Sequence, residues 1–193
     1  MFYALAKVVV GIILKILFRI EVIGSENIPV GGCIICPNHR SNFDPPLVAC
    51  FIKRRVYYMA KQELFENKFI AVILKGLGAF PIKRGASDIT AIKNSMKLLK
   101  DGKMLGIFPE GKRSKDNTLG EAEPGVAMLA IKMKVPVVPI AIMGNYKLFS
   151  RITIKIGNPC NLEQYAKSKN TNDDYKRISQ NILLDIKALM EEN

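Results

Sequence analysis

Residues 33–46 read CIICPNHRSNFDPP and pass from an apolar run into a polar turn. The continuous apolar run at 33–36 is typical of a buried strand. The turn carries His39, the only histidine of the chain, and Asp44 follows five residues later. The two prolines after Asp44 suit the first turn of a helix, where a missing N–H costs nothing. This stretch therefore predicts a strand, a turn holding a base and a carboxylate, and a helix.

On both sides of this stretch, apolar strand-like runs alternate with segments of helical periodicity. Such alternation predicts an α/β domain with a mixed central sheet flanked by helices. Pro139 indicates an edge or irregular pairing for its strand, and the alternating run at 152–156 fits an outer strand. The expected strands are 20–24, 33–36, 56–59, 79–82, 104–108, 135–142 and 152–156. The expected helices are 45–52 with Asp44 as N-cap, one or two within 62–75, one capped by Ser87 or Asp88 and closed by Gly102, 124–132 and 173–191.

Length and charge limit the classes of function. The chain has 193 residues, about the length of one domain, and we expect that domain over 21–193 with an appendage at 1–20. Its 29 Lys and Arg against 17 Asp and Glu give a net charge of +12, which indicates an anionic partner. Aromatic residues make up 8% of the chain, and none are interleaved with a basic run, so we expect no nucleic-acid partner.

The four cysteines stand at positions 33, 36, 50 and 160. They include one C-x₂-C pair, but no second pair or second histidine completes a local zinc site, so we expect no metal. Cys33 and Cys36 fall in the apolar run at 33–36 and are expected to pack as small hydrophobic residues. The alternative is a redox pair, which would need a thioredoxin-like βαβ context that the sequence does not show. The cysteines fit a reducing, cytosolic environment.

Residues 1–20 form an apolar segment that is expected to be an amphipathic membrane helix. In a helical projection Lys7, Lys15 and Arg19 fall on one side as a basic stripe. A spanning helix would have to bury some of these charges, whereas a helix lying in the membrane plane offers them to anionic headgroups. We therefore expect an interfacial anchor contacted through Lys7, Lys15 and Arg19, with a tilted span and a core-packed helix as alternatives.

Three polar turns follow expected strands, and each carries side chains that can take part in catalysis or binding. They are the turn from His39 to Asp44, the turn at Lys83 and Arg84, and the turn from Glu110 to Ser114. The carboxyl ends of parallel strands in an α/β domain gather at one edge, so the turns are expected to converge. Together they supply one base, one acid and several cations. The alternative for Arg84 and Arg113 is a solvated surface cation.

His39 suits the role of general base because an imidazole can take up a proton near neutral pH. Asp44 would hold one ring nitrogen and stabilise the imidazolium that forms, as the acid does in a serine hydrolase triad. No nucleophile elbow surrounds Ser41, so the attacking hydroxyl can belong to the substrate itself. Asp44 could also serve only as a helix cap, because Asp before two prolines is a good N-cap.

Four sequence blocks resemble, in order and spacing, those of the glycerolipid acyltransferase family, the lysophosphatidate acyltransferases. They cover some 110 residues between 33 and 142. The blocks are NH-x₄-D from Asn38, GAFPIKR from Gly78, FPEGKRS from Phe108 and VPVVPI from Val135. The resemblance implies an α/β acyltransferase domain over 21–193 and transfer of an acyl group from a thioester to 1-acyl-glycerol-3-phosphate, giving phosphatidate.

The resemblance also implies roles for single residues. His39 deprotonates the 2-hydroxyl of the acceptor and Asp44 orients His39, with no acyl-enzyme, metal or cofactor. The co-substrate is acyl-CoA or acyl-carrier protein. The residues that bind the glycerol phosphate of the acceptor are Arg84, Glu110, Gly111 and Arg113, joined by Lys83 and Lys112 in the same blocks.

Two features depart from the family pattern. Lys83 stands where acidic residues are common, which suggests another acceptor headgroup or an extra phosphate contact. The N-terminal segment is short, which suggests one anchoring helix. We expect a membrane-associated enzyme on the cytosolic face of the cell membrane, with a phospholipid membrane and a lysophospholipid as partners. The alternatives are an acyltransferase for glycerol 3-phosphate or another lysolipid, and a noncatalytic basic protein that binds anionic membranes or, less well supported, nucleic acid.

Overall fold

The structure is a computed structural model, and it describes residues 2–83, 88–114, 119–166 and 169–192. Within these ranges the strands form one seven-stranded sheet in the order β1-β7-β6-β2-β5-β3-β4. Neighbouring strands are parallel, except that β6 and β7 pair antiparallel, so the sheet is mixed as expected. The strands are β1 (Arg19–Ile23), β2 (Cys33–Pro37), β3 (Val56–Lys61), β4 (Ala79–Ile82), β5 (Met104–Gly106), β6 (Val137–Gly144) and β7 (Arg151–Ile156).

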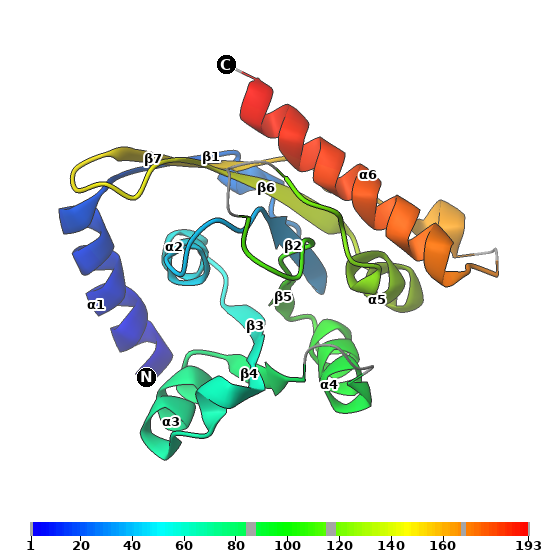
Figure 1. The fold of residues 1–193 in the computed structure, drawn as a ribbon, viewed down its shortest axis with the longest axis horizontal. Helices are drawn as coiled ribbons and strands as arrows, with labels where there is room; N and C mark the ends of the chain where they lie inside the picture. The colour runs from blue at the N-terminus through cyan, green and yellow to red at the C-terminus, as the bar shows by residue number, and fades with distance from the viewer. Residues whose placement is uncertain (1, 84–87, 115–118, 167–168, 193) are drawn as a thin grey trace.

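Helices cover both faces of this sheet (Figure 1). Three begin with a side-chain cap: Asn67 caps α3, Asp88 caps α4, and Thr171 forms a capping box with Asp174 at α6. Each cap accepts a bond from an N–H group that the first turn leaves unpaired, which explains why these helices begin there. The helices are α1 (Phe2–Leu17), α2 (Asp44–Phe51), α3 (Lys68–Gly76), α4 (Ile89–Lys100), α5 (Gly125–Met133) and α6 (Asn172–Glu191), with 3-10 turns at Ser25–Asn27, Gln62–Phe65 and Glu163–Tyr165.

The core has two parts, one on each face of the sheet, because successive residues of a strand point to opposite faces. Ile34 and Cys36 of β2 belong to the cluster formed with α4, α5 and α6. Cys33 and Ile35 belong to the cluster formed with α1 and α2. Both cysteines are fully buried and free, so they pack as the small hydrophobic residues that the sequence predicted.

Two expectations about strand position are wrong. Strand β6 is central, between β2 and β7, so of the two pairings that Pro139 indicated, edge or irregular, the edge is wrong. The Pro139 carbonyl accepts a bond from the N–H of Gly157, just past the end of β7, so the N–H that proline lacks would lie where this ladder ends. Strand β7 is not an outer strand either, because β1 adds beside it through the pairing of Arg19 with Arg151.

The N-terminal helix differs from the expected 1–20 segment. It ends at Leu17, because the N–H of Phe149 donates to the Leu17 carbonyl and the N–H of Arg19 donates to the Ser150 carbonyl. Arg19 therefore lies on β1, and its expected place on a helical basic stripe is wrong. Within the described ranges, none of the helices combines the length and the hydropathy needed to cross a bilayer.

The two lysines of α1 are turned toward α2 rather than away from the protein. The Lys7 ammonium donates to the carbonyl of Ile52 and, at 3.3 Å, to that of Lys53. The Lys15 ammonium lies 5.9 Å from the ring centroid of Phe51, at the end of the same helix. Apart from Lys15, the residues that α1 leaves exposed are therefore apolar, and the large ones are Phe2, Leu5, Val8, Val9, Ile12, Ile13 and Ile16.

Candidate active site

The candidate site lies at the carboxyl end of β2, near the centre of the sheet. Asn38, the first residue after β2, is 1% exposed. Its amide donates to the carbonyl of Ile142 at 3.1 Å and accepts from the N–H of Ile142 at 2.6 Å, which ties the turn to β6. His39 follows directly, so its position is fixed by the sheet rather than by a free loop.

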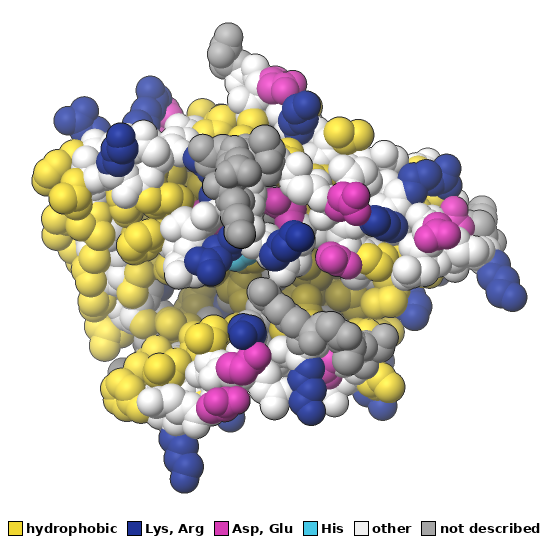
Figure 2. Space-filling model, viewed as in Figure 1, with side chains coloured by type: hydrophobic (Ala, Val, Ile, Leu, Met, Phe, Trp, Pro, Cys, Tyr) yellow, Lys and Arg dark blue, Asp and Glu magenta, His cyan; other side chains and the backbone are white. Residues whose placement is uncertain are grey.

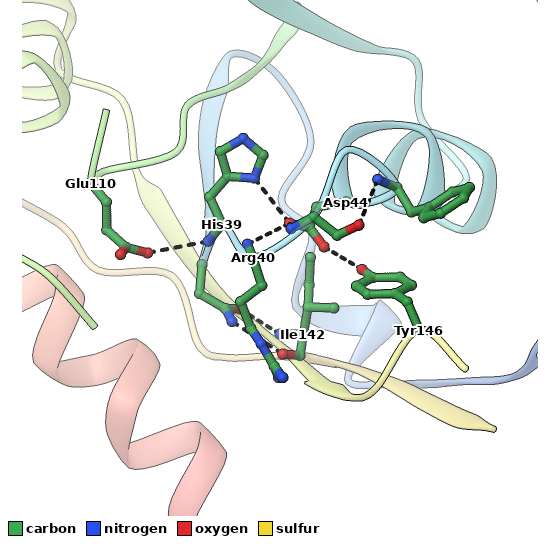
Figure 3. A network of polar contacts seen from close by, with 9 residues as sticks. His39, Arg40, Asp44, Glu110, Ile142 and Tyr146 are labelled. Atoms are coloured by element: carbon green, nitrogen blue, oxygen red, sulfur yellow. Dashed lines mark hydrogen bonds and ion pairs between the residues drawn. The ribbon is translucent and has the colours of Figure 1, made fainter. Parts of the chain in front are cut away.

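His39 and Asp44 are joined as the sequence predicted. His39 Nδ1 lies 2.9 Å from Asp44 Oδ2 (Figure 3). The Asp44 carboxylate also accepts from the N–H groups of Arg40 and Ser41, each at 2.6 Å, and from the hydroxyl of Tyr146. Because donors surround the carboxylate, it acts as an acceptor and holds the proton of a neutral imidazole on Nδ1. The lone pair of Nε2 then points away from Asp44.

Asp44 does not cap its helix in the expected way. It is the first residue of α2, and Phe43 stands at the N-cap with no side-chain bond. The carboxylate turns back toward the N–H groups of Arg40 and Ser41 instead of forward into the helix. The side chain is 0% exposed, so a carboxylate with this many donors is a buried acceptor whose position is set by the whole turn.

The His39 ring is also held by an aromatic contact. Phe108, which follows β5, stacks on the imidazole at a centroid distance of 4.0 Å and an interplanar angle of 25°. Tyr58 of β3 in turn stacks on Phe108, at a centroid distance of 6.0 Å. The side chain of His39 is 12% exposed, so one edge of a well-packed ring remains accessible.

The turn that carries Glu110 converges on His39, as expected. Glu110 Oε1 accepts from the N–H of His39 at 3.2 Å, and Oε2 accepts from the N–H of Gly120 at 3.1 Å. The N–H of Ser114 donates to the His39 carbonyl at 2.9 Å. Glu110 is 3% exposed, and both of its oxygens are engaged by the backbone. Its carboxylate therefore joins the two turns.

The other residues of this turn face solvent. Gly111 has φ +65, and a Cβ there would lie 3.0 Å from Cγ of Glu123, so the turn favours glycine. Lys112 and Arg113 are exposed on the same turn that bonds to His39, which places two cations near the histidine. In Figure 2 the histidine is recessed beside a hollow with hydrophobic side chains on its floor, and Lys and Arg side chains lie in front of it.

The second expected turn is only partly described. Lys83 follows β4, is exposed, and its N–H donates to Asp88 Oδ2 at 2.9 Å. Strand β4 runs parallel to β3 and β3 to β5, so Lys83 lies at the same edge of the sheet as His39. Arg84 lies outside the described residues. Among the residues that are described, no three His, Cys, Asp or Glu side chains gather as metal ligands.

Sequence reasoning missed Tyr146 and the roles of Asn38 and Phe108. Tyr146 is separated from Asp44 by 102 positions, and no local pattern marks it. Its only signal is its place shortly after β6, because β6 runs parallel to β2, the strand that leads into the His39 turn. Asn38 and Phe108 stand beside the acid–base and glutamate motifs, so position could have identified them as supports for the site.

The fold and the site define a class: an α/β protein with a histidine and a buried carboxylate arranged for proton transfer. Comparisons with known proteins narrow this class. The model of the Acyltransferase family matches residues 19–143. This chain belongs to the acyltransferase family.

Similar proteins carry a more specific name. A 1-acyl-sn-glycerol-3-phosphate acyltransferase of Bacillus subtilis is 34% identical over 162 residues, which are 80% of this chain and 80% of that protein. A chloroplastic 1-acyl-sn-glycerol-3-phosphate acyltransferase of Brassica napus is 32% identical over 75% of this chain and 43% of its own length. The crystal structure of the 1-acyl-sn-glycerophosphate acyltransferase PlsC of Thermotoga maritima has a TM-score of 0.77, with 23% identity over 99% of this chain and 80% of that chain. This last likeness concerns the fold.

Proposed function

We propose that this chain transfers an acyl group from an acyl thioester to the 2-hydroxyl of 1-acyl-glycerol-3-phosphate, with phosphatidate as the product. The observation that carries the proposal is the His39–Asp44 pair, which leaves Nε2 of His39 without a hydrogen-bond partner among the described residues, at the same edge of the sheet as the exposed cations Lys112 and Arg113. The name shared by the similar proteins supports this acceptor.

In the proposed reaction, Nε2 of His39 takes the proton of the acceptor's hydroxyl as the hydroxyl oxygen attacks the thioester carbonyl. The C–S bond then breaks, and the leaving thiolate takes the proton from the imidazolium. Asp44 stabilises the imidazolium that forms between these two steps. General base catalysis of this kind contributes on the order of 10²–10⁴-fold in rate. The steps use acyl-CoA or acyl-carrier protein as the co-substrate and need no metal or further cofactor.

The phosphate of the acceptor is assigned to the cations around the turn. Lys112 and Arg113 are exposed beside His39, and Lys83 follows β4 at the same edge. Arg84, which lies outside the described residues, is assigned to the phosphate because it belongs to the same sequence block as Lys83. Guanidinium and ammonium groups form charge-assisted bonds with phosphate oxygens. Glu110 and Gly111 are assigned an indirect part in acceptor binding, because Glu110 fixes the turn and Gly111 allows its shape.

We also propose that the protein is associated with a phospholipid membrane, on its cytosolic face. The support is the outward surface of α1, where every exposed residue except Lys15 is apolar. Figure 2 shows hydrophobic side chains gathered over α1 and also over α3, where Phe69 is 75% and Val72 69% exposed. The two helices adjoin, because a Cβ at Gly76 of α3 would lie 2.5 Å from the ring of Phe2. Burial of such a surface in lipid favours membrane binding.

The membrane contact proposed here differs from a basic stripe. Lys7 and Lys15 lie against α2, and Arg19 lies on β1, so the contact rests first on apolar side chains. Arg19 remains exposed next to the end of α1, where it can meet an anionic headgroup. Lys15 is exposed as well and can reach the headgroup level along its aliphatic stem.

The test is an incubation of purified protein with labelled acyl-CoA or acyl-carrier protein and a panel of acceptors. The panel holds 1-acyl-glycerol-3-phosphate, glycerol 3-phosphate and lysolipids with other headgroups, and wild type is compared with His39→Ala. We expect ester formation with 1-acyl-glycerol-3-phosphate and its loss in His39→Ala. Preference for another acceptor would correct the substrate, and no His39-dependent ester with any acceptor would contradict the enzymatic function.

A further inference from the structure

Tyr146 contacts Asp44 from a distant part of the chain. It lies in the segment between β6 and β7, and its hydroxyl donates to Asp44 Oδ1. Figure 3 shows its ring approaching Asp44 from the side opposite to His39. Within the described residues, the other side-chain and backbone donors to this carboxylate are His39, Arg40 and Ser41, all on Oδ2. Tyr146 is therefore the partner of the second oxygen.

The Tyr146 ring is itself held in place. It packs edge-on against Phe18 at a centroid distance of 5.6 Å and 80°, and it stacks on Phe43 at 5.6 Å and 28°. The segment that carries it is fixed to α1 by the bond of 2.7 Å from the N–H of Phe149 to the carbonyl of Leu17. Because these contacts hold the ring, the Tyr146 hydroxyl can fix the rotation of the Asp44 carboxylate about its Cβ–Cγ bond.

We propose that Tyr146 is a positioning residue that holds the Asp44 carboxylate and so sets the proton affinity of His39. This inference rests on the proposed role of His39 as the base and adds a residue to that site. Tyr146 does not touch the reacting atoms in this arrangement, because Asp44 lies between it and the imidazole.

The direction of the effect follows from how the carboxylate shares its charge. A donor on Oδ1 draws electron density from the carboxylate and weakens the attraction of Oδ2 for an imidazolium. Removing the donor should therefore favour the protonated form of His39. Burial, and then the charge and bond of Asp44, raise the pKa of Tyr146, so its hydroxyl remains a donor throughout the neutral range.

The other ionisable groups around this pair come from three elements. Arg40 lies in the same turn, and Tyr58 faces the carboxylate from β3. Glu110, which follows β5, bonds to the N–H of His39. Among the described residues, the side chains of Arg40, Tyr58 and Glu110 form no hydrogen bond with the Asp44 carboxylate, so Tyr146 is the group whose removal changes the bonding of Asp44 directly.

The test reads the protonation of His39 without substrate, so it is independent of the proposed reaction. Because His39 is the only histidine, its imidazole signals in an NMR titration are unambiguous. Tyr146→Phe keeps the ring and removes the hydroxyl. The matched control is Tyr58→Phe, since the Tyr58 hydroxyl is buried without a hydrogen-bond partner near the same site. Both variants are first checked for wild-type thermal unfolding.

We expect Tyr146→Phe to move the midpoint of the His39 titration upward by on the order of half a pH unit, and Tyr58→Phe to leave it in place. The ascending limb of the pH profile of kcat/KM should move by the same amount. An unchanged or lowered midpoint, or an equal change in Tyr58→Phe, would overturn the proposal. If the midpoint moves as expected but the wild type forms no ester, the proposed function fails and this inference stands.

Two further measurements guard against a variant that fails to fold. In Asp44→Asn, the additional change Tyr146→Phe should leave the His39 midpoint where Asp44→Asn places it, because Tyr146 acts through the carboxylate. In the wild type, the Tyr146 hydroxyl proton should exchange slowly and resonate downfield, and this signal should vanish in Asp44→Asn. A full additional shift in the double variant, or the absence of such a proton in the wild type, would contradict the positioning role.

Discussion

The turn around His39 and the N-terminal helix both depart from the usual rule that charged side chains are exposed and apolar side chains are buried. In the turn, Asp44 is a carboxylate with 0% exposure, and it is stabilised by donors from its own turn and from Tyr146. On α1, Leu5 and Ile16 are apolar side chains with 66% and 65% exposure. Buried charge and exposed apolar surface both cost free energy in water. For Asp44 this cost is offset within the fold, by its donors, whereas for α1 we propose that it is offset outside the fold, by a lipid surface.

The two regions should be separable by substitution. Asp44→Asn removes the carboxylate and leaves α1 intact. We expect the rate of acyl transfer to fall on the order of 10²–10⁴-fold, because the imidazolium loses its stabilising partner. Binding to phospholipid vesicles, measured by sedimentation, should be unchanged. A variant that loses vesicle binding along with activity would show that the two regions do not act separately.

The reverse change places charges on the outer surface of α1. In the triple variant Leu5→Glu, Ile12→Glu and Ile16→Glu, we expect vesicle binding to fall by about a hundredfold or more, because each large apolar side chain contributes roughly 1.5–3 kcal/mol on burial. The control carries the same substitution at exposed apolar positions elsewhere, namely Val30, Ile89 and Leu184. Equal losses in the two triple variants would mean that net charge, and not the α1 surface, decides binding.

A substitution of Glu110 tests whether its buried carboxylate positions the turn that carries Lys112 and Arg113. Glu110→Gln keeps one acceptor oxygen and removes the charge, so one of the two backbone bonds to His39 and Gly120 is lost. A bond to a charged group contributes about 1.5–3 kcal/mol, so we expect roughly a tenfold rise or more in the KM for the acceptor. The KM for the acyl thioester serves as the control. An unchanged KM for the acceptor would contradict the indirect role of Glu110 in acceptor binding.

The smallest expected effect concerns Lys7. Lys7→Met removes the bonds to the carbonyls of Ile52 and Lys53, and we expect the free energy of unfolding in urea to fall by about 1 kcal/mol. Binding to anionic vesicles should stay at the wild-type level, since this ammonium faces α2. A membrane contact through Lys7 predicts the opposite pattern, with weaker binding by about 1 kcal/mol and unchanged stability.

Much of the fold followed from local signals. The apolar run of β2, the cap at Asp88 and the pairing of His39 with Asp44 depend on residues close in sequence. These features have short-range causes, such as a hydrogen bond from a side chain to the first turn of a helix. The sequence blocks added the expected family, which the matching family model supports.

The features that were predicted wrongly or missed depend on contacts between distant segments. Strand order cannot be read from a run of residues, so the central position of β6 and the pairing of Arg19 with Arg151 were missed. The same pairing ends α1 at Leu17 and removes Arg19 from the helix. Tyr146 was missed because only the folded sheet brings it to Asp44. Helical periodicity placed Lys7 on one side of α1 but could not tell which side α2 covers.

The proposed function requires α1 to bring the His39 turn to an acceptor held in a bilayer. The most direct test compares the α1 triple variant with wild type on two acceptors. One is long-chain 1-acyl-glycerol-3-phosphate in vesicles, and the other is a short-chain homologue dissolved below its micelle concentration. We predict that the variant loses transfer to the vesicle-bound acceptor and keeps near wild-type transfer to the dissolved one. Equal rates for variant and wild type on vesicles, or equal losses on both acceptors, would contradict the claim.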